Sequence, residues 1–158
     1  MSAGRRRNRG FTLLGLLLVV GVLGAGLAAY GQIYSHQARR DKEAELLFRG
    51  NQYRLAIESY YRNGDSYPKT LDDLLADNRF PTPVRHLRKR YADPMTGKAE
   101  WGLVKTPDGE RIIGVHSTSE AAPIKTGNFD LVNKHFADAK TYKDWQFFHS
   151  PAGAPPAQ

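Results

Sequence analysis

The sequence predicts an α+β protein in which one long amino-terminal helix packs on a small antiparallel β-sheet. An uncharged apolar run covers residues 11–34, and apolar side chains continue at helical spacing as far as Asn63. Farther along, residues 100–105 and 111–116 are two short segments with strand-forming side chains on either side of a Pro-Asp-Gly turn, a pattern typical of a β-hairpin. The helix and the hairpin together indicate the fold class.

The apolar run is predicted to cross a membrane. It contains 24 residues, from Phe11 to Tyr34, and no acidic or basic side chain occurs before His36. As a helix that rises about 1.5 Å per residue, it is long enough to span a hydrocarbon core of about 30 Å. Four arginines precede it, at positions 5, 6, 7 and 9, and basic residues beside a membrane helix stay on the cytoplasmic side. We therefore expect the carboxyl-terminal domain on the opposite side.

The second half of the long helix is predicted to be amphipathic. Its apolar positions are Leu46, Tyr53, Ile57, Tyr60 and Tyr61, and charged residues occupy the other faces, at Arg39, Lys42, Glu43, Glu45, Arg49 and Arg54. Asn63 and Gly64 are expected to end the helix, with the glycine in the left-handed conformation. The predicted core of the domain places this apolar face against a hairpin that carries Trp101 and Ile113.

Shorter elements are predicted on either side of the hairpin. Thr70 and Asp73 have the spacing of a capping box for a short helix over Leu71, Leu74 and Leu75. Asn128 is expected to cap another short helix with Phe129, Val132 and Phe136, and residues 142–147 are expected to add a last strand. The segment 150–158 contains only small or polar residues and is predicted to be a disordered tail.

Composition limits the class of protein. With 158 residues, and roughly 120 of them outside the predicted leader and membrane helix, the chain has room for one small domain, which excludes large multidomain enzymes. Without the four arginines before the apolar run, 19 of the 23 basic residues remain against 16 acidic ones, so nucleic acid is not an expected partner. Cysteine is absent, which excludes disulfides and thiolate metal sites.

The junction between the arginines and the apolar run resembles the class III leader of type IV prepilins and type II secretion pseudopilins. It reads Arg5-x-x-x-Arg9-Gly10-Phe11-Thr12-Leu13-Leu14. Later segments are similar to a branch of pseudopilin-like type II secretion proteins: Tyr-Pro-x-Thr-Leu-x-x-Leu from Tyr67, Asp-Pro-x-x-Gly from Asp93, Ile-Gly-Val-His-Ser-x-Ser from Ile113, and Trp145-x-Phe147. The resemblance implies cleavage between Gly10 and Phe11 by a prepilin peptidase and N-methylation of Phe11.

The same resemblance implies a division of the chain and a set of partners. Residues 1–10 would be the leader, 11–34 the transmembrane and filament-core helix, 35–149 a periplasmic pilin-like head, and 150–158 the tail. The subunit would be held in the inner membrane with a cytoplasmic amino terminus and then assembled with other pilin-like subunits. An inner-membrane platform protein and a cytoplasmic ATPase would drive assembly, and the chain itself would be neither an enzyme nor the holder of a cofactor.

Two other functions stay open. One is a type IV pilin or minor pilin for adhesion, motility or DNA uptake, although such pilins often close a carboxyl-terminal loop with a disulfide that this chain cannot form. The other is a membrane-tethered periplasmic binding module whose leader is not cut. The nature of the mature amino terminus separates this module from the two pilin-like alternatives.

Glycines in the apolar run are the candidate assembly residues. The resembling family usually has a glutamate five residues after the cut, where this chain has Gly15, and this difference favours a minor subunit over an abundant one. Gly21 and Gly24 each have an alanine four residues later, a spacing that permits close packing of helices. Glycine is also simply tolerated in membrane helices, so this spacing alone does not decide the matter.

No catalytic or metal site is predicted. The five histidines, at 36, 86, 116, 135 and 149, include no pair at the i, i+4 spacing of helical metal ligands, and His116 beside Ser117 lacks the surroundings of a nucleophile. For calcium, the loop 117–130 offers only Glu120 and Asp130 as carboxylates, which favours a polar loop held by its own hydrogen bonds. The basic cluster 85–90 is expected to be a solvated loop, with a contact to an acidic neighbouring subunit as the alternative.

Overall fold

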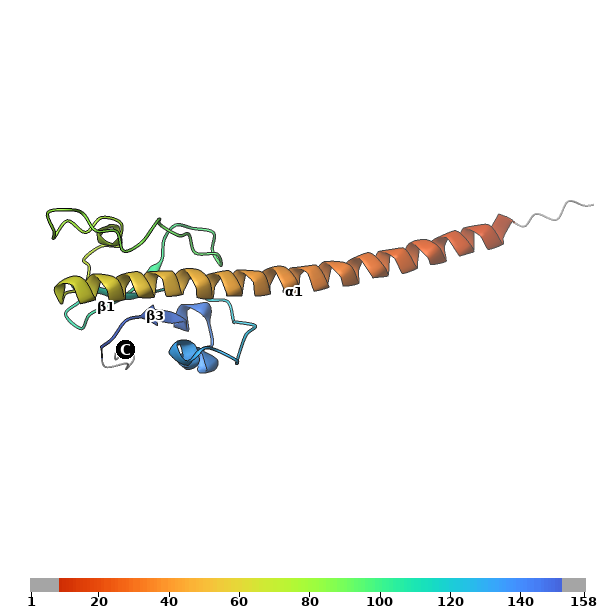
Figure 1. The fold of residues 1–158 in the computed structure, drawn as a ribbon. Helices are drawn as coiled ribbons and strands as arrows, with labels where there is room; N and C mark the ends of the chain where they lie inside the picture. Colours follow the sequence, from red (N-terminus) through yellow and green to blue (C-terminus); the bar gives the residue numbers. More distant parts are fainter. Residues whose placement is uncertain (1–8, 152–158) are drawn as a thin grey trace, which may run out of the picture. The chain divides into compact units, whose positions relative to one another are not determined.

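The computed structural model describes the backbone of residues 9–151 and, within the long helix, the side chains of residues 13–24 and of residue 36 onward. Most of the predicted leader and nearly all of the predicted tail lie outside the described residues. The chain divides into two compact units, Met1–Arg39 and Arg40–Gln158. Helix α1, Arg9–Gly64, enters both units (Figure 1), so the prediction of a single helix as far as Asn63 is confirmed.

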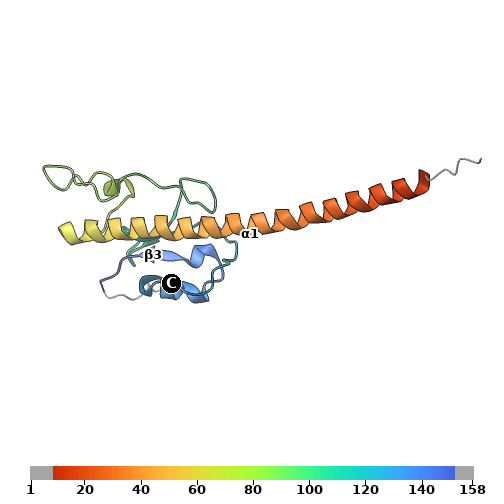
Figure 2. The same cartoon turned by 45° about the vertical axis from the view of Figure 1, so that its right-hand side comes forward.

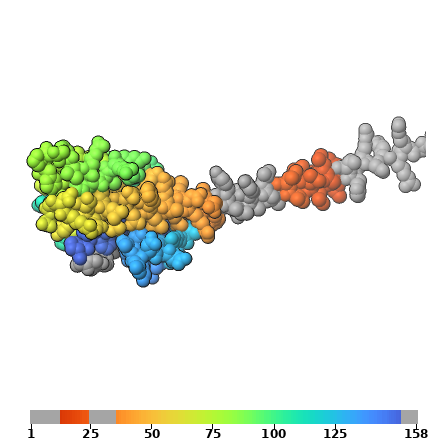
Figure 3. Space-filling view, viewed as in Figure 1, coloured from red at the N-terminus to blue at the C-terminus, as the bar shows by residue number. Residues whose placement is uncertain are grey.

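The second unit is an α+β domain, as predicted. Its antiparallel sheet contains β1 (Gly102–Lys105), β2 (Ile112–His116) and β3 (Gln146–Phe148), in the order β1-β2-β3. Figures 1 and 2 show residues 65–100 along one side of α1 and the segment that contains β3 along the other side. Figure 3 shows the same arrangement at the surface, with α1 between the two.

The hairpin forms where its turn residues indicated. Gly109 has a φ of 74°, a left-handed conformation that glycine adopts without steric cost, and its N–H donates to the Thr106 carbonyl at 2.8 Å. Strands β1 and β2 then pair in the register Val104↔Gly114. The last predicted strand is confirmed in part, since β3 pairs with β2 in the register Val115↔Phe147 but begins only at Gln146.

The predicted core is confirmed except for one hairpin residue. Leu46, Tyr53 and Ile57 on α1 are fully buried and belong to one cluster with Trp101, which is 7% exposed. Ile113 is also 7% exposed, but Ile112 and Val115 represent β2 in this cluster in its place. An aromatic group that the sequence did not single out as core completes it, with Phe136 stacked on Trp145 at 5.3 Å. The core side chains are Leu46, Tyr53, Ala56, Ile57, Tyr60, Leu71, Leu74, Leu87, Trp101, Ile112, Val115, Phe136, Tyr142, Trp145 and Phe147.

Two predictions about helix ends are wrong in detail. Helix α1 includes Gly64, and the left-handed residue is Asp65, with a φ of 47° and an N–H that donates to the Tyr61 carbonyl at 2.8 Å. Aspartate tolerates this conformation better than most residues because its short polar side chain bonds locally. Asn128 also has a positive φ, 61°, and does not cap the next helix, η2 (Leu131–Asp138), whose cap position is Asp130.

One of the other two short helices lies where the sequence predicted it, whereas the second replaces the first part of the strand predicted over residues 142–147. The 3-10 helix η1 covers Asp72–Leu74, and the Asp73 carboxylate accepts N–H groups from Lys69 and Thr70, which is one half of the predicted capping box. The 3-10 helix η3, Tyr142–Asp144, has both halves of a capping box, between Thr141 and Asp144. The Asp73 and Asp144 carboxylates thus accept N–H groups from the residues just before η1 and η3.

Glu43 is the main correction to the predicted faces of α1. The sequence analysis predicted it to be among the solvated charged residues, but Glu43 is only 3% exposed. It lies three residues before Leu46, on the same side of the helix as the core residues. A buried carboxylate needs hydrogen-bond donors around it, and the domain provides them from residues far along the chain.

Candidate functional site

The most distinctive surface of the described chain is the apolar stretch 13–24 of α1. All twelve of its residues are exposed. Figure 3 shows one face of this stretch in red, and twelve consecutive residues occupy every side of a helix. Its large side chains are 52–68% exposed and are Leu13, Leu14, Leu16, Leu17, Leu18, Val19, Val20, Val22 and Leu23. A helix that is apolar all round is stable only where lipid or other helices cover it.

The candidate assembly glycines lie in this stretch. A Cβ atom built on Gly15, Gly21 or Gly24 meets no other atom within 4 Å among the residues that the structure describes. All three positions therefore have space for a second helix. The predicted processing residues Gly10 and Phe11 fall in the first turn of α1, and their side chains lie outside the described residues.

The predicted membrane span is only partly described. Its residues 11–12 and 25–34 have side chains outside the described set. Across those parts of the chain that the structure does describe, none of the helices combines the length and the apolar character that a membrane crossing requires.

A buried chain of polar groups fastens the segment 77–86 to α1. The carboxylate of Asp77 is fully buried and accepts from Arg79 at 2.7 Å, and its Oδ2 lies 3.2 Å from Nε2 of His86. The other ring nitrogen of His86 lies 2.8 Å from the hydroxyl of Ser59 on α1. Arg79 also donates to the Tyr60 carbonyl at 2.8 Å.

The Ser59, His86 and Asp77 side chains have the composition of a hydrolytic triad but not its setting. The His86 side chain is 1% exposed, and Asp77 is bonded to a guanidinium that holds it ionised. Hydrogen bonding from Arg79 lowers the pKa of Asp77 far below its usual range, and the cost of burial does not offset this. A triad carboxylate acts by orienting and stabilising a histidine that can reach substrate, whereas this network joins two segments of the core.

The polar residues near His116 also have structural partners. The Ser117 hydroxyl donates to the buried carboxylate of Asp93 at 2.7 Å, and the ring of His116 bonds to the Ser117 carbonyl at 2.8 Å. Asp93 begins the predicted turn to Gly97, which closes with a 2.7 Å hydrogen bond and a φ of 73° at the glycine. Ser117 therefore fixes the turn to β2 and does not face His116 as a nucleophile would face its base.

Glu43 holds the loop 117–130, whose few carboxylates make it a poor calcium site by sequence. Its carboxylate accepts from the N–H of Ile124 at 2.6 Å, the N–H of Lys125 at 3.2 Å and the hydroxyl of Tyr142 at 2.9 Å. The two candidate ligands in the loop, Glu120 and Asp130, are exposed. In the described part of the chain, no three side chains of the His, Cys, Asp or Glu type come together as metal ligands.

We therefore predict that Glu43, and not calcium, maintains this loop. Glu43→Ala is expected to destabilise the domain by about 1–3 kcal/mol, because two partly buried N–H groups and a buried hydroxyl lose their acceptor. Glu45→Ala is the matched control, since Glu45 is exposed and its ion pair is with Arg49, one turn along the helix. Thermal unfolding measures both, and a large upward shift of the Tm with calcium would contradict the assignment.

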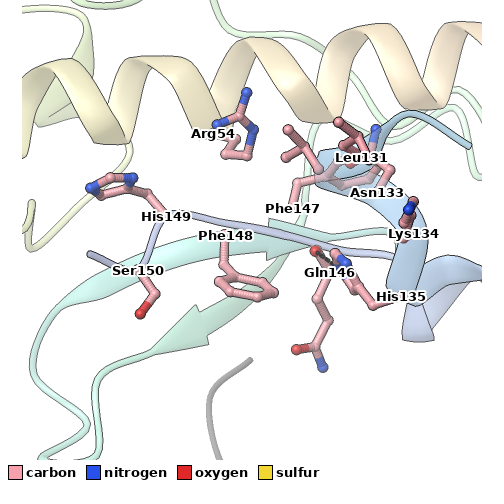
Figure 4. A pocket seen from close by; sticks show the side chains of 11 residues that line it. Arg54, Leu131, Asn133, Lys134, His135, Gln146, Phe147, Phe148, His149 and Ser150 are labelled. Atoms are coloured by element: carbon pink, nitrogen blue, oxygen red, sulfur yellow. Dashed lines mark hydrogen bonds between the residues drawn. The ribbon is translucent and has the colours of Figure 1, made fainter. Parts of the chain in front are cut away.

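A hollow in the domain lies beside β3 and has a volume of about 430 Å³. Its walls come from α1, η2 and the segment 146–150, as Figure 4 shows, and its lining residues are Arg54, Leu131, Val132, Asn133, Lys134, His135, Gln146, Phe147, Phe148, His149 and Ser150. The sequence did not indicate the hollow, since its walls come from three separate segments.

The basic cluster 85–90 lies away from the hollow. Its residues Arg85, Arg88, Lys89 and Arg90 are exposed in a loop, in agreement with the prediction.

No protein-family model, no curated protein and no solved structure matches this chain. The resemblance of the leader and of the head segments to pseudopilins therefore stays a prediction, which rests on the residues quoted above.

Proposed function

We propose that the chain is a pseudopilin-like structural subunit of a type II secretion filament. Its leader is cut between Gly10 and Phe11, residues 11–34 hold the subunit in the inner membrane, and the head lies in the periplasm. Other pilin-like subunits then cover the apolar helix when a platform protein and a cytoplasmic ATPase assemble the filament. The subunit contributes surface and shape, and its partners supply the force.

The exposed apolar stretch of α1 carries this proposal. Nine large aliphatic side chains are exposed between Leu13 and Leu23. Full burial of one such side chain is worth about 1.5–3 kcal/mol, so covering all nine is worth on the order of 15 kcal/mol before the entropy of ordering is subtracted. That exceeds the stability of many small domains, and a helix with such a surface is driven into lipid or against other helices.

The arginine-rich leader adds the second support. A cut after Gly10 removes the basic residues at positions 5, 6, 7 and 9 and keeps the apolar helix attached to the head. Ordinary removal of a secretory signal would instead discard the apolar segment. Processing at this junction therefore yields a subunit with an apolar helix at its amino terminus, which suits both storage in a membrane and packing in a filament.

The cleavage is tested by Gly10→Val. We expect the full-length precursor to accumulate in the membrane, because glycine before the scissile bond admits close approach of a protease to the backbone. Mass spectrometry of the wild-type chain should find N-methylated Phe11 as the first residue. Gly4→Val makes the same change within the leader but away from the junction and should be processed normally. Normal processing of Gly10→Val would overturn the proposal, and an uncut wild-type leader would favour the tethered binding module.

Copy number is expected to be low. The resembling family usually has a glutamate where this chain has Gly15, and an unpaired carboxylate in hydrocarbon is costly. The resemblance implies that this glutamate pairs with the amino terminus of a neighbouring subunit and so sets the register between their helices. Gly15 cannot make this contact, so a repeating stack of this subunit would lack one source of register. We predict that quantification of sheared filaments finds this chain as a minor component. If it is the most abundant subunit, Gly15 has a different role from the one proposed.

The type IV pilin alternative shares the processing step and differs in what the filament does. Deletion of the gene separates the two functions. Loss of protein secretion with intact surface fibres supports the secretion subunit, whereas loss of adhesion, motility or DNA uptake with normal secretion supports a pilin or minor pilin.

A further inference from the structure

The hollow beside β3 follows the open edge of the sheet. In the order β1-β2-β3, strand β3 pairs with β2 on one side only. The pocket residues 146–150 are those of β3 and its continuation, and η2 lies across from them (Figure 4). An unpaired strand edge is a template for another extended chain.

The register shows which backbone groups of β3 point outward. The N–H of His149 donates to the Ile113 carbonyl at 2.9 Å, and the residue opposite Val115 is Phe147. Because hydrogen-bonded and non-hydrogen-bonded pairs alternate in an antiparallel ladder, the backbone groups of Phe147 and His149 face β2. Those of Gln146 and Phe148 therefore face the open edge.

One of the outward groups already has a partner. The Nε2 atom of His135 on η2 lies 3.1 Å from the Gln146 carbonyl, so η2 closes that end of the edge. The N–H and the carbonyl of Phe148 stay directed at the hollow. They form the donor and acceptor pair that an added strand uses.

The side chains around this edge are basic and apolar. The hollow is lined by Arg54 and Lys134, with no aspartate or glutamate among its lining residues. Arg54 pairs with Glu58 at 3.3 Å, but Glu58 also pairs with Arg62 at 2.6 Å, so this group of three charges stays positive. Burial lowers the pKa of His149, so this side chain is largely neutral at neutral pH.

Apolar contacts complete the surface. Leu131 is 80% exposed and Val132 is 52% exposed, and both line the hollow. In Figure 4, Phe147 points towards α1 and Phe148 points to the opposite side of the sheet. A strand that pairs with Phe148 thus meets aliphatic side chains from η2 and positive charge from α1 and η2.

We propose that this edge binds an extended segment of a partner protein that pairs with the backbone of Phe148 and carries carboxylates towards Arg54 and Lys134. Charge decides between the occupants. A second copy paired through the same edge would place like charges opposite each other, which is unfavourable. The chain's own tail has no acidic side chain, and its Pro155 and Pro156 lack the N–H that a ladder needs.

The test uses the full-length protein in detergent and a short synthetic peptide of alternating glutamate and valine. We expect the peptide to bind and to slow hydrogen exchange at the amide of Phe148. The amide of Leu103 is the internal control, since it points out from the edge of β1 and should not change. A peptide with lysine in place of glutamate should bind at least about tenfold more weakly. A peptide with alternate N-methylated amides should not bind.

Charge reversal supplies the matched variants. Lys134→Glu should weaken binding of the acidic peptide about tenfold and improve binding of the lysine peptide. Lys105→Glu makes the same change on the exposed face of β1 and should leave both affinities unchanged. Neither side chain is buried, so both variants are expected to fold.

Four results would overturn the proposal. These are no binding of the acidic peptide, equal binding of the lysine peptide, binding without protection of Phe148, and equal effects of the two charge reversals. Two further results would assign the edge to another occupant. If the Phe148 amide is protected in the free protein and loses protection when residues 152–158 are deleted, the tail occupies it. If its protection rises with protein concentration, a second copy does.

Discussion

Asp77→Asn is expected to lower the free energy of unfolding by about 3 kcal/mol. Losing one partner of a buried ion pair costs about 3–5 kcal/mol, and the lower end applies because the Arg79 side chain is 26% exposed and regains some hydration. Asp77 itself is buried and accepts from three groups of Arg79, its backbone N–H, Nε and Nη2, at 2.7–3.1 Å. Urea unfolding of the domain measures the difference.

The effect should extend to the contact between α1 and the segment 77–86. Arg79 lies over the Tyr60 ring at 3.6 Å and donates to the Tyr60 carbonyl, and it holds this position because Asp77 fixes its guanidinium. Without the carboxylate, His86 loses one of its two polar partners as well. We expect faster hydrogen exchange in residues 77–86 before the rest of the domain is affected.

The same variant should change how stability depends on pH. The pKa of Asp77 is depressed in the folded chain, whereas an unfolded aspartate titrates near about 3.9. The stabilisation is therefore complete above that unfolded value and is lost as the pH falls through it towards the folded pKa. The stability gap between wild type and Asp77→Asn should be constant near neutral pH and should narrow below about pH 4.

Asp72→Asn is the matched control for both measurements. Asp72 lies five positions before Asp77, but its side chain is 66% exposed and its pair with Arg90 is 3.5 Å long. Exposed ion pairs of this kind contribute about 0–1 kcal/mol. Equal effects of the two substitutions would show that the network around Asp77 is not what stabilises this part of the domain.

The parts of the fold that local sequence determines were predictable. The apolar positions Leu46, Tyr53 and Ile57 follow the helical period, and all three are buried. The turns at Gly97 and Gly109 were indicated by residues that adopt a positive φ, and both glycines have one. These predictions depend only on residues within a few positions of each other.

The parts that depend on distant segments were not predictable. Glu43 has the spacing of the core residues, but the donors that make its burial possible lie 81 to 99 positions later in the chain. The network of Ser59 and Asp77 could not be predicted either, because the side chain that joins them, His86, lies 27 positions after Ser59. The open edge of β3 could not be predicted, because the strand order and register that define it are not specified by the sequence.

Gly50 shows how a distant contact can require a residue that is locally unfavourable. Glycine in the middle of a helix costs about 1 kcal/mol relative to alanine. In the fold, the space that a Cβ atom would need is filled by the ring of Phe147, which is 1% exposed. The glycine is required by the strand that packs on the helix, and neither residue predicts the other.

Ile57→Ala is expected to destabilise the domain by about 2–5 kcal/mol, because it removes buried methyl groups and leaves a cavity that close-packed neighbours fill only in part. Ile57 is fully buried, in a core with Tyr53 and Tyr60 from the same helix. Leu55→Ala is the matched control, since Leu55 is two positions earlier on the same helix and is 47% exposed.

Thermal and denaturant unfolding of a fragment that begins at Arg39 measures both variants, and the full chain in detergent checks them. The fragment is expected to fold without metal or reductant, because the core side chains all lie beyond its first residue and the chain contains no cysteine. Leu55→Ala should change the free energy of unfolding by no more than about 0.5 kcal/mol, as surface substitutions usually do. A similar, small change for Ile57→Ala would mean that α1 does not belong to the core, because the two variants differ only in what covers the side chain.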